Sequence, residues 1–141
     1  MDSFVVGTDG SPGAEAAIRK LIELAGGSGA SVHLVSAYPG KSTLERLGMT
    51  ARQDTIDMRG VAMDVLARDE RRFREAGFEV EKHVREGDPA HVLIDVASEN
   101  DADLIAVGAR GSAGVRRFML GSVSSKLAHH APSSLLIVRQ E

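Results

Sequence analysis

Five short apolar segments alternate with stretches of helical periodicity along this chain, and no other feature limits the possible folds as strongly. Each segment is bounded by glycine, proline, serine or aspartate, which are the residues that favour turns. A helix between two strands returns the chain to the same end of a sheet, so that successive strands can run parallel. The expected strands are residues 3–8, 31–37, 78–84, 104–107 and 134–138.

Four helices are expected between these strands, and two of them carry clear start signals. Ser11 followed by Pro12 is typical of an N-cap and a first helical position, and Asp88 followed by Pro89 repeats the pattern. The expected helices are residues 12–25, 53–76, 89–98 and 123–130, and residues 38–50 receive no assignment. The apolar face of the long second helix is expected to be formed by Ile56, Met63, Leu66 and Phe73.

This order of elements predicts an α/β fold of the Rossmann-like class, with a doubly wound, five-stranded parallel sheet. No boundary, repeat or low-complexity stretch interrupts the pattern, so residues 1–141 are expected to form one domain. The first and fourth strands are expected to flank the point where the strand order reverses. Ligands of such sheets bind beyond the carboxyl ends of the strands at that point, which would bring Asp9 beside the segment after the fourth strand.

The segment after the fourth expected strand carries the clearest functional pattern. Gly108, Gly111 and Gly121, followed by Ser122, give the spacing Gly-x2-Gly-x9-Gly-Ser between a buried strand and a helix. Glycine lets a backbone curve closely around an anion, and a helix N-terminus offers unpaired N–H groups and a favourable dipole. We therefore predict a phosphate site, with the hydroxyls of Ser122 and Ser124 as donors. The alternative is that the glycines are structural and that Ser122 is a plain N-cap.

Charged residues near this loop could complete a ligand site. Arg110, Arg116 and Arg117 could neutralise phosphates, or they could form a solvated loop face. Asp9, at the end of the first strand, could accept a hydrogen bond from a ribose hydroxyl or hold Mg²⁺ through water, and no residue is expected to bind a metal directly. Alternatively, Asp9 only forms a turn with its own backbone. The Walker A lysine and the Gly-x-Gly-x-x-Gly dinucleotide pattern are both missing from the sequence.

Other classes of site find little support. The five histidines suggest no metal centre. His33 and His83 lie in expected strands and His91 in an expected helix, and the adjacent His129 and His130 point about 100° apart on a helix, so they cannot share a metal. No serine lies in the Gly-x-Ser-x-Gly turn of acyl-transfer enzymes. A phospho-accepting receiver domain would need an acidic pair after the first strand, where Asp9 stands alone.

Composition restricts the partners and the location. A net charge of −3, a pI near 5.9, one tyrosine and no tryptophan argue against nonspecific binding of nucleic acid. No apolar run approaches the ~20 residues that span a bilayer, so no membrane contact is expected. The absence of cysteine excludes disulfides and thiolate metal sites. The acidic N-terminus enters a strand at once and does not resemble a signal peptide, so the cytoplasm is the expected location.

Long stretches of the sequence resemble the universal stress protein family, in its ATP-binding type. The similar stretches include VVGTDGSPGAEAAIRKLIELA near the start, EGDPAHVLIDVASENDADLIAVGARG in the middle and GSVSSKLAHHAPSSLLIV near the end, with the glycine spacing intact. The resemblance implies an adenine nucleotide alpha hydrolase-like fold with strand order 3-2-1-4-5. It also implies ATP, with Mg²⁺, as the ligand, and a homodimer formed through Ser134–Val138.

The resemblance also implies roles for individual residues. Asp9 would contact the sugar–phosphate region, and Ala37 would border the adenine, at a position where the family usually has valine. The ribose and phosphates would be enclosed, largely through backbone N–H groups, by Gly108, Gly111, Gly121, Ser122, Val123 and Ser124.

The expected function is ATP binding in stress response or signalling. Hydrolysis is expected to be slow or missing, because the sequence offers no positioned base, nucleophile or Arg–Lys clamp for phosphoryl transfer. One alternative is a dimeric interaction module that binds another adenine ligand, such as cyclic AMP, or none. Another is an adenylate-transferring enzyme, although the stretch from Thr8 to Ser11 matches the Ser-Gly-Gly-x-Asp-Ser loop of such enzymes only faintly.

Overall fold

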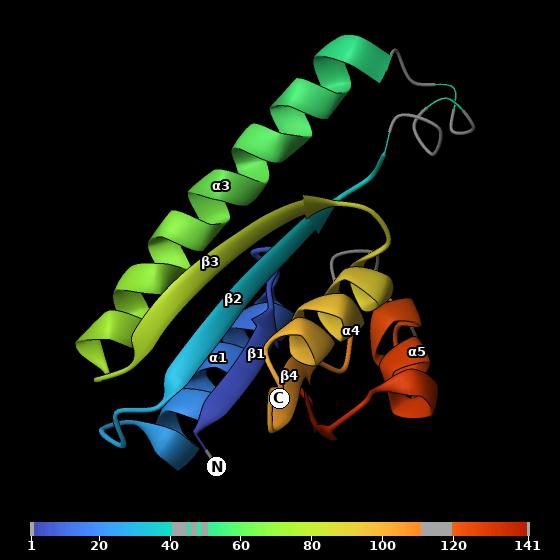
Figure 1. Ribbon diagram of the computed structural model, residues 1–141. Coiled ribbons are helices and arrows are strands. Elements are labelled where there is room, and N and C mark those ends of the chain that lie inside the picture. Colours follow the sequence, from blue (N-terminus) through green and yellow to red (C-terminus); the bar gives the residue numbers. More distant parts are fainter. Residues whose placement is uncertain (1, 41–44, 46–47, 49–50, 111–119, 141) are drawn as a thin grey trace.

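The computed structural model describes residues 2–40, 45, 48, 51–110 and 120–140, with the backbone alone at 51–57. Within these residues, five parallel strands form one sheet, and helices cover both of its faces (Figure 1). The strands are β1 (Ser3–Gly7), β2 (Ser31–Tyr38), β3 (Glu79–Glu86), β4 (Leu104–Gly108) and β5 (Ser134–Val138). The helices are α1 (Pro12–Ala25), α3 (Ala51–Glu75), α4 (Pro89–Glu99) and α5 (Ser122–His130).

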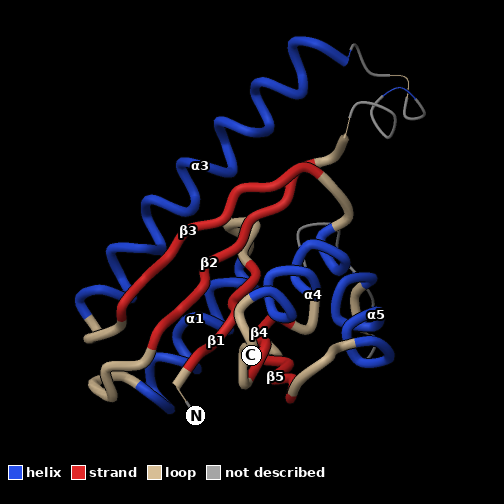
Figure 2. Tube along the Cα trace, in the orientation of Figure 1, coloured by secondary structure: helices blue, strands red, loops and turns tan. Residues whose placement is uncertain are grey.

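The strand order is β3-β2-β1-β4-β5, which confirms the predicted order 3-2-1-4-5 and the parallel sheet. β1 lies between β2 and β4, and its Val5 has His33 on one side and Ile105 on the other. The strand order therefore reverses between β1 and β4, as expected. Figure 2 shows these two strands side by side in the middle of the sheet.

Alternate residues of the central strand point into two separate cores, because successive side chains of a strand face opposite sides. On one face, Phe4 and Val6 of β1 pack in a cluster with Ile18 of α1 and Phe73 of α3. On the other face, Val5 packs in a cluster with residues of α4 and α5. Both faces of β1 are therefore covered, as is usual for a parallel sheet.

The long helix α3 buries a face that differs from the prediction. Leu66 and Phe73 are buried as expected, but Met63 is 52% exposed, and the side chain of Ile56 lies outside the described residues. The buried positions, which repeat every three or four residues, are Ala62, Leu66, Asp69 and Phe73. Asp69 hides this pattern in the sequence, because a carboxylate normally belongs to the exposed face of a helix. None of the described helices, α3 included, is long and apolar enough to span a bilayer.

The local start signals of two helices are confirmed. Ser11 accepts a hydrogen bond from the N–H of Ala14 (3.3 Å), and Asp88 accepts one from the N–H of His91 (3.2 Å). All the expected elements are present, with boundaries that differ from the prediction by at most two residues. The side-chain hydrogen bonds act within one turn of helix, which explains why sequence alone locates these helix starts.

Candidate functional site

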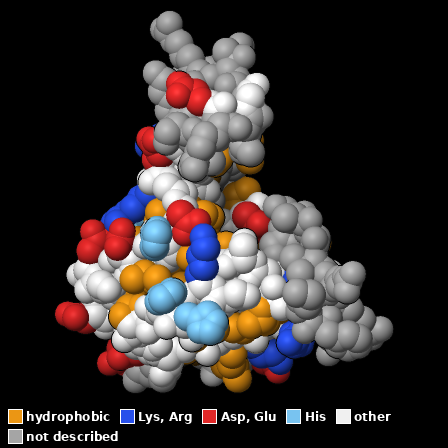
Figure 3. Space-filling view, turned by 90° about the vertical axis from the view of Figure 1, so that its right-hand side faces the viewer, with side chains coloured by type: hydrophobic (Ala, Val, Ile, Leu, Met, Phe, Trp, Pro, Cys, Tyr) orange, Lys and Arg blue, Asp and Glu red, His pale blue; other side chains and the backbone are white. Residues whose placement is uncertain are grey.

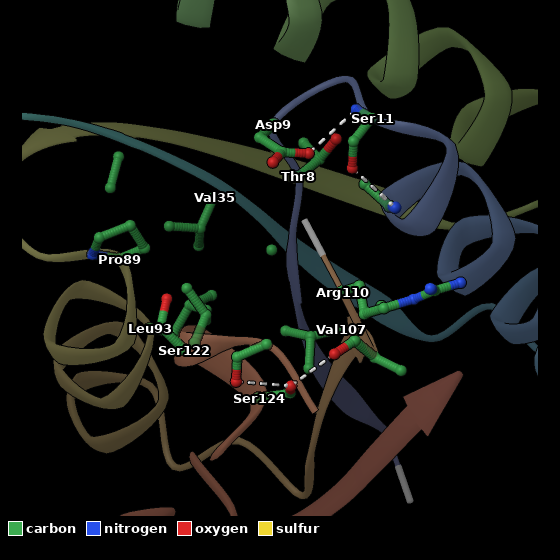
Figure 4. Close-up of a pocket in the computed structure, with 17 residues that line it drawn as sticks. Thr8, Asp9, Ser11, Val35, Pro89, Leu93, Val107, Arg110, Ser122 and Ser124 are labelled. Atoms are coloured by element: carbon green, nitrogen blue, oxygen red, sulfur yellow. Dashed lines mark hydrogen bonds between the residues drawn. The ribbon is translucent and has the colours of Figure 1, made fainter. Parts of the chain in front are cut away.

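A cavity of about 430 Å³ opens at the carboxyl ends of β1 and β4, where the strand order reverses. This volume lies within the usual range of small-molecule sites. The cavity is lined by every predicted site residue that the structure describes, namely Asp9, Ala37, Gly108, Arg110, Gly121, Ser122, Val123 and Ser124 (Figure 4). The predicted site residue Gly111 lies outside the described residues, as do Arg116 and Arg117.

One part of the cavity wall is apolar. It is formed by Val35 and Ala37 of β2, Leu93 of α4, Val107 of β4 and Val123 of α5. Val35, Leu93 and Val107 are buried, which fixes this surface as part of the core beneath α4 and α5. An apolar surface of this kind suits the face of a planar ring rather than a charged group.

Another part of the wall is the N-terminus of α5. Gly121 is the N-cap of this helix, so the alternative in which Ser122 is the N-cap is wrong; Ser122 is the first helical residue and is exposed. A glycine has no side chain to accept hydrogen bonds from the first turn, whereas Ser11 and Asp88 do so at α1 and α4. The first-turn N–H groups of α5 and the positive end of its dipole are therefore available at the cavity, in an arrangement that binds anions.

The carbonyl oxygen of Ala109 fixes the two ends of the glycine loop to each other. The N–H of Gly121 and the hydroxyl of Ser124 both donate to this oxygen, each at 2.7 Å. Ser124 is only 1% exposed, and Figure 4 shows its side chain hydrogen-bonded to the backbone. The hydroxyl proton of Ser124 is thus used by the backbone and not directed to a phosphate, which differs from the prediction. The backbone N–H of Ser124 belongs to the first turn of α5.

Two glycines bring backbone segments into direct contact beside the cavity. A Cβ atom on Gly108 would lie 2.6 Å from the carbonyl group of Gly13, and one on Gly13 would overlap the carbonyl oxygen of Arg110. Gly13 is missing from the sequence-based prediction, although a glycine at the second position of a helix is unfavourable and can signal a close approach. This contact sets the end of β4 against the start of α1, so that both border one cavity.

A buried carboxylate from α3 holds the loop between β1 and α1. Asp69 has no exposed surface; its Oδ2 accepts a hydrogen bond from the Thr8 hydroxyl (2.9 Å), and its Oδ1 accepts one from Nε of Arg68 (3.2 Å). The Thr8 oxygen in turn accepts from the N–H of Gly10 (3.2 Å), whose φ of 77° favours glycine. No local sequence signal could identify this support, because Thr8 and Asp69 lie 61 positions apart.

Among the described residues of the cavity wall, Asp9 and Arg110 carry the charged side chains. Asp9 is exposed, and its Oδ1 accepts a hydrogen bond from the N–H of Ser11 (2.9 Å), so the predicted turn is present. A carboxylate accepts several hydrogen bonds, so this turn is compatible with a ligand contact at the same residue. The side chain of Arg110 extends toward the α1 side of the cavity (Figure 4).

Comparison with known proteins identifies relatives along the whole chain. Residues 1–139 match the model of the universal stress protein family. A universal stress protein of Mycobacterium tuberculosis (strain ATCC 25618 / H37Rv) is 31% identical over 139 residues, which cover 96% of this chain and 94% of the relative. The crystal structure of a universal stress protein in complex with cAMP is 28% identical, with a TM-score of 0.74, and the match covers 99% of this chain and 98% of that one. The universal stress protein from Archaeoglobus fulgidus in complex with dAMP is 27% identical, with a TM-score of 0.71 and 98% of each chain covered. The chain belongs to the universal stress protein family.

Proposed function

We propose that this universal stress protein binds an adenine nucleotide in the cavity between β1 and β4, and that its ligand in stress response or signalling is ATP with Mg²⁺. The observation that carries the proposal is the N-terminus of α5, which has no capping side chain and faces a cavity with an apolar wall. Phosphate oxygens can accept hydrogen bonds from the first-turn N–H groups while a purine ring lies on the apolar wall. The relatives solved with cAMP and dAMP support an adenine ligand.

Individual residues have distinct roles in this proposal. Ala37 borders the adenine, and the glycine loop from Gly108 through Gly111 to Gly121 surrounds the ribose and phosphates. The backbone N–H groups of Ser122, Val123 and Ser124 bind phosphate oxygens. Mg²⁺ prefers oxygen ligands and keeps several water molecules, so the phosphates and a water-mediated contact to Asp9 suit it.

The protein is proposed to hold ATP without turning it over efficiently. The described residues of the cavity wall include one acidic and one basic side chain, Asp9 and Arg110, and neither a lysine nor a histidine. Efficient phosphoryl transfer relies on several cationic groups around the phosphates and on a residue that positions the nucleophile. We therefore expect hydrolysis to be slow or undetectable, with bound ATP acting as a signal in the cytoplasm.

Calorimetric titration of nucleotide-free protein with ATP, with and without Mg²⁺, tests the binding proposal. Binding to one site per chain is expected, together with a higher melting temperature. The absence of both heat and a melting-temperature shift at millimolar ATP would exclude the proposal. Mass spectrometry of nucleotide that co-purifies with the protein is an independent check.

A paired substitution tests whether the glycine loop forms the site. Gly121→Val places a branched side chain at the N-cap of α5, and we expect it to abolish ATP binding while leaving the fold intact. Gly60→Val is the matched control, because a Cβ atom at Gly60 on α3 meets nothing within 4 Å. Unchanged ATP affinity in Gly121→Val would remove the loop from the site.

A cyclic nucleotide is the second candidate ligand, since a relative 28% identical to this chain has been solved with cAMP. ATP carries a polyphosphate that can engage several N–H groups at α5, whereas cAMP carries a single phosphodiester. Competition between ATP, AMP and cAMP for the same site separates the candidates. ATP is expected to compete most strongly, and tighter binding of cAMP would replace the ATP proposal with the cyclic nucleotide.

The last part of the proposal is a homodimer formed through β5. This strand lies at the edge of the sheet and carries Leu135, Leu136 and Ile137, which are all partly exposed. An apolar edge strand left unpaired favours association with another chain. Sedimentation analysis should give a dimer, and Ile137→Lys should favour the monomer. Leu24→Lys is the control, because Leu24 is an exposed apolar residue on α1 (64% exposed). A monomer at tens of micromolar protein would contradict this arrangement.

A further inference from the structure

Two histidines and a glutamate from neighbouring strands converge on one face of the sheet, although the sequence suggests no metal centre there. His33 of β2 lies beside Glu81 of β3 in the register, and His83 follows two residues later. Residues paired in register, and residues two apart on a strand, point to the same face. This side-chain group, called the His33–Glu81–His83 cluster below, includes no described residue of the nucleotide cavity.

The separations within the cluster resemble those of a tetrahedral metal site. Nδ1 of His33 lies 3.0 Å from Nε2 of His83 and 3.5 Å from Oε2 of Glu81, and Nε2 of His83 lies 3.9 Å from Oε1 of Glu81. Four ligands at zinc bond lengths of 2.0–2.1 Å would stand about 3.3 Å from one another. The observed separations lie on both sides of that value, so small side-chain movements suffice for a common ion.

Burial of the cluster favours a defined site over a chance surface contact. The side chains of His33 and His83 are only 10% and 11% exposed, while that of Glu81 is 66% exposed. The two rings are thus held by the packing around β2 and β3, and the carboxylate is free to rotate toward an ion. The exposed side also leaves room for a water molecule as the fourth ligand, which three-residue zinc sites commonly have.

The nearby cationic side chains are already paired with carboxylates. Arg85, next on the same face of β3, lies 2.7 Å from Glu99 of α4. Lys82 points to the other face of the sheet and lies 3.1 Å from Glu70 of α3. Repulsion of a bound cation by these groups is therefore reduced by their partners.

We propose that the His33–Glu81–His83 cluster is a zinc site that links the edge strand β3 to β2. Two imidazole nitrogens and one carboxylate form a ligand set suited to Zn²⁺ and poorly suited to Mg²⁺ or Ca²⁺, which prefer oxygen. Without metal, the short contact between the two rings is a hydrogen bond in which one ring nitrogen donates and the other accepts. When Zn²⁺ binds the two facing nitrogens, the donating ring carries its proton on its other ring nitrogen instead, so that both histidines bind the ion as neutral imidazoles.

The experiment uses the whole 141-residue chain without an affinity tag, treated with chelator and titrated with ZnCl₂ by calorimetry. One Zn²⁺ per chain and a higher melting temperature are expected. Glu81→Gln should weaken binding at least tenfold, and His83→Gln should abolish it. Glu81 is largely exposed, so Glu81→Gln keeps the test valid even where a histidine variant folds poorly.

Exposed histidines elsewhere on the protein require a matched control. Figure 3 shows histidine side chains on the surface of the molecule. His91 of α4 and both His129 and His130 of α5 are exposed. His91→Gln and the double variant His129→Gln/His130→Gln should leave the tight Zn²⁺ site unchanged. Co²⁺ bound in place of Zn²⁺ should give the visible absorption of a four-coordinate site, and Glu81→Gln should alter that spectrum.

Two results would overturn the zinc site. One is no Zn²⁺ binding at tens of micromolar metal. The other is binding that survives in Glu81→Gln and His83→Gln but is lost in the variants of the exposed histidines. ATP binding is measured on the same samples and is expected to be retained in Glu81→Gln, so failure of the zinc site is distinguishable from failure of the nucleotide site.

Discussion

At the scale of single residues, the cavity depends on positions where even one extra carbon atom does not fit. The end of β4 meets the start of α1 through Gly108 and Gly13, with backbone against backbone. The neighbouring Ala109 oxygen receives two hydrogen bonds that fix the ends of the glycine loop. A glycine of the Gly-x2-Gly-x9-Gly-Ser pattern can therefore be required because two backbone segments pack against each other there, and not only because a phosphate must approach the backbone.

Gly108→Ala should destabilise the fold because its Cβ atom would lie 2.6 Å from the Gly13 carbonyl group. Overpacking of this kind typically lowers the free energy of unfolding by about 1–3 kcal/mol, which urea unfolding measures. Gly60→Ala is the control: a Cβ atom there meets nothing within 4 Å, and alanine in a helix interior should stabilise by up to about 1 kcal/mol. If Gly108→Ala were as stable as the wild type, the backbone segments at Gly108 and Gly13 would be able to move apart at little cost in free energy.

At the scale of elements, one side chain joins two helices that border the cavity. Asp88 caps α4 through the N–H of His91 (3.2 Å), and its Oδ1 lies 3.0 Å from Nζ of Lys126 on α5. Burial alone would raise the pKa of Asp88, but the hydrogen bonds from Lys126 and from the N–H of His91 outweigh it, and the pKa is lowered. Asp88 thus stabilises the folded state in its charged form.

Asp88→Ala should lower the free energy of unfolding by about 1 kcal/mol at pH 7, the usual cost of losing an N-cap. A carboxyl group with a lowered pKa in the folded state stabilises fully above its unfolded pKa of about 3.9, and this contribution is lost as the pH falls through the folded value. The difference between Asp88→Ala and the wild type should therefore shrink as the pH falls from 5 toward 3. Ser98→Ala, at an exposed position of the same helix, removes no ionisable group and should show no such dependence. A constant difference across this range would contradict the charged-state role.

At the scale of the whole molecule, the sheet separates two cores and carries two candidate sites. The nucleotide cavity involves β1, β4 and α5 near the reversal of strand order, whereas the zinc site involves β2 and the edge strand β3. The two sites are neighbours, because Val35 of the cavity wall pairs in register with His83. ATP and Zn²⁺ should nevertheless stabilise different parts of the sheet.

Hydrogen exchange should separate the two sites. ATP at 100 times its dissociation constant stabilises the folded state by about 2.7 kcal/mol, and exchange should slow most in the β1–α1 loop and the first turn of α5. Zn²⁺ should instead slow exchange most in β3. The measurement is exchange detected by mass spectrometry on the wild type, with Glu81→Gln as the zinc control. If ATP, added without Zn²⁺, slowed exchange only in β3, the positions assigned to the two sites would be contradicted.

The sequence by itself determined the features that depend on neighbouring residues. Alternating apolar and helical stretches predicted the parallel sheet, whose strand order 3-2-1-4-5 the family resemblance supplied. Ser11 and Asp88 marked helix starts, because a cap acts on the next three residues. The glycine spacing predicted a loop between β4 and α5 that borders the cavity. A single domain over residues 1–141 and the individual nucleotide contacts stay predictions.

Only the tertiary structure decided which distant residues meet. Asp69 reaches Thr8 across 61 positions, Gly13 meets the end of β4, and His33 meets His83 across 50 positions. The histidine pair depends on the register of β2 and β3, where a shift of one residue would turn every side chain of a strand to the opposite face. Packing between layers likewise placed a carboxylate at a buried position of α3, where helical periodicity alone favours an apolar residue. Register and layer packing arise from the whole fold, so no local pattern in the chain could reveal them.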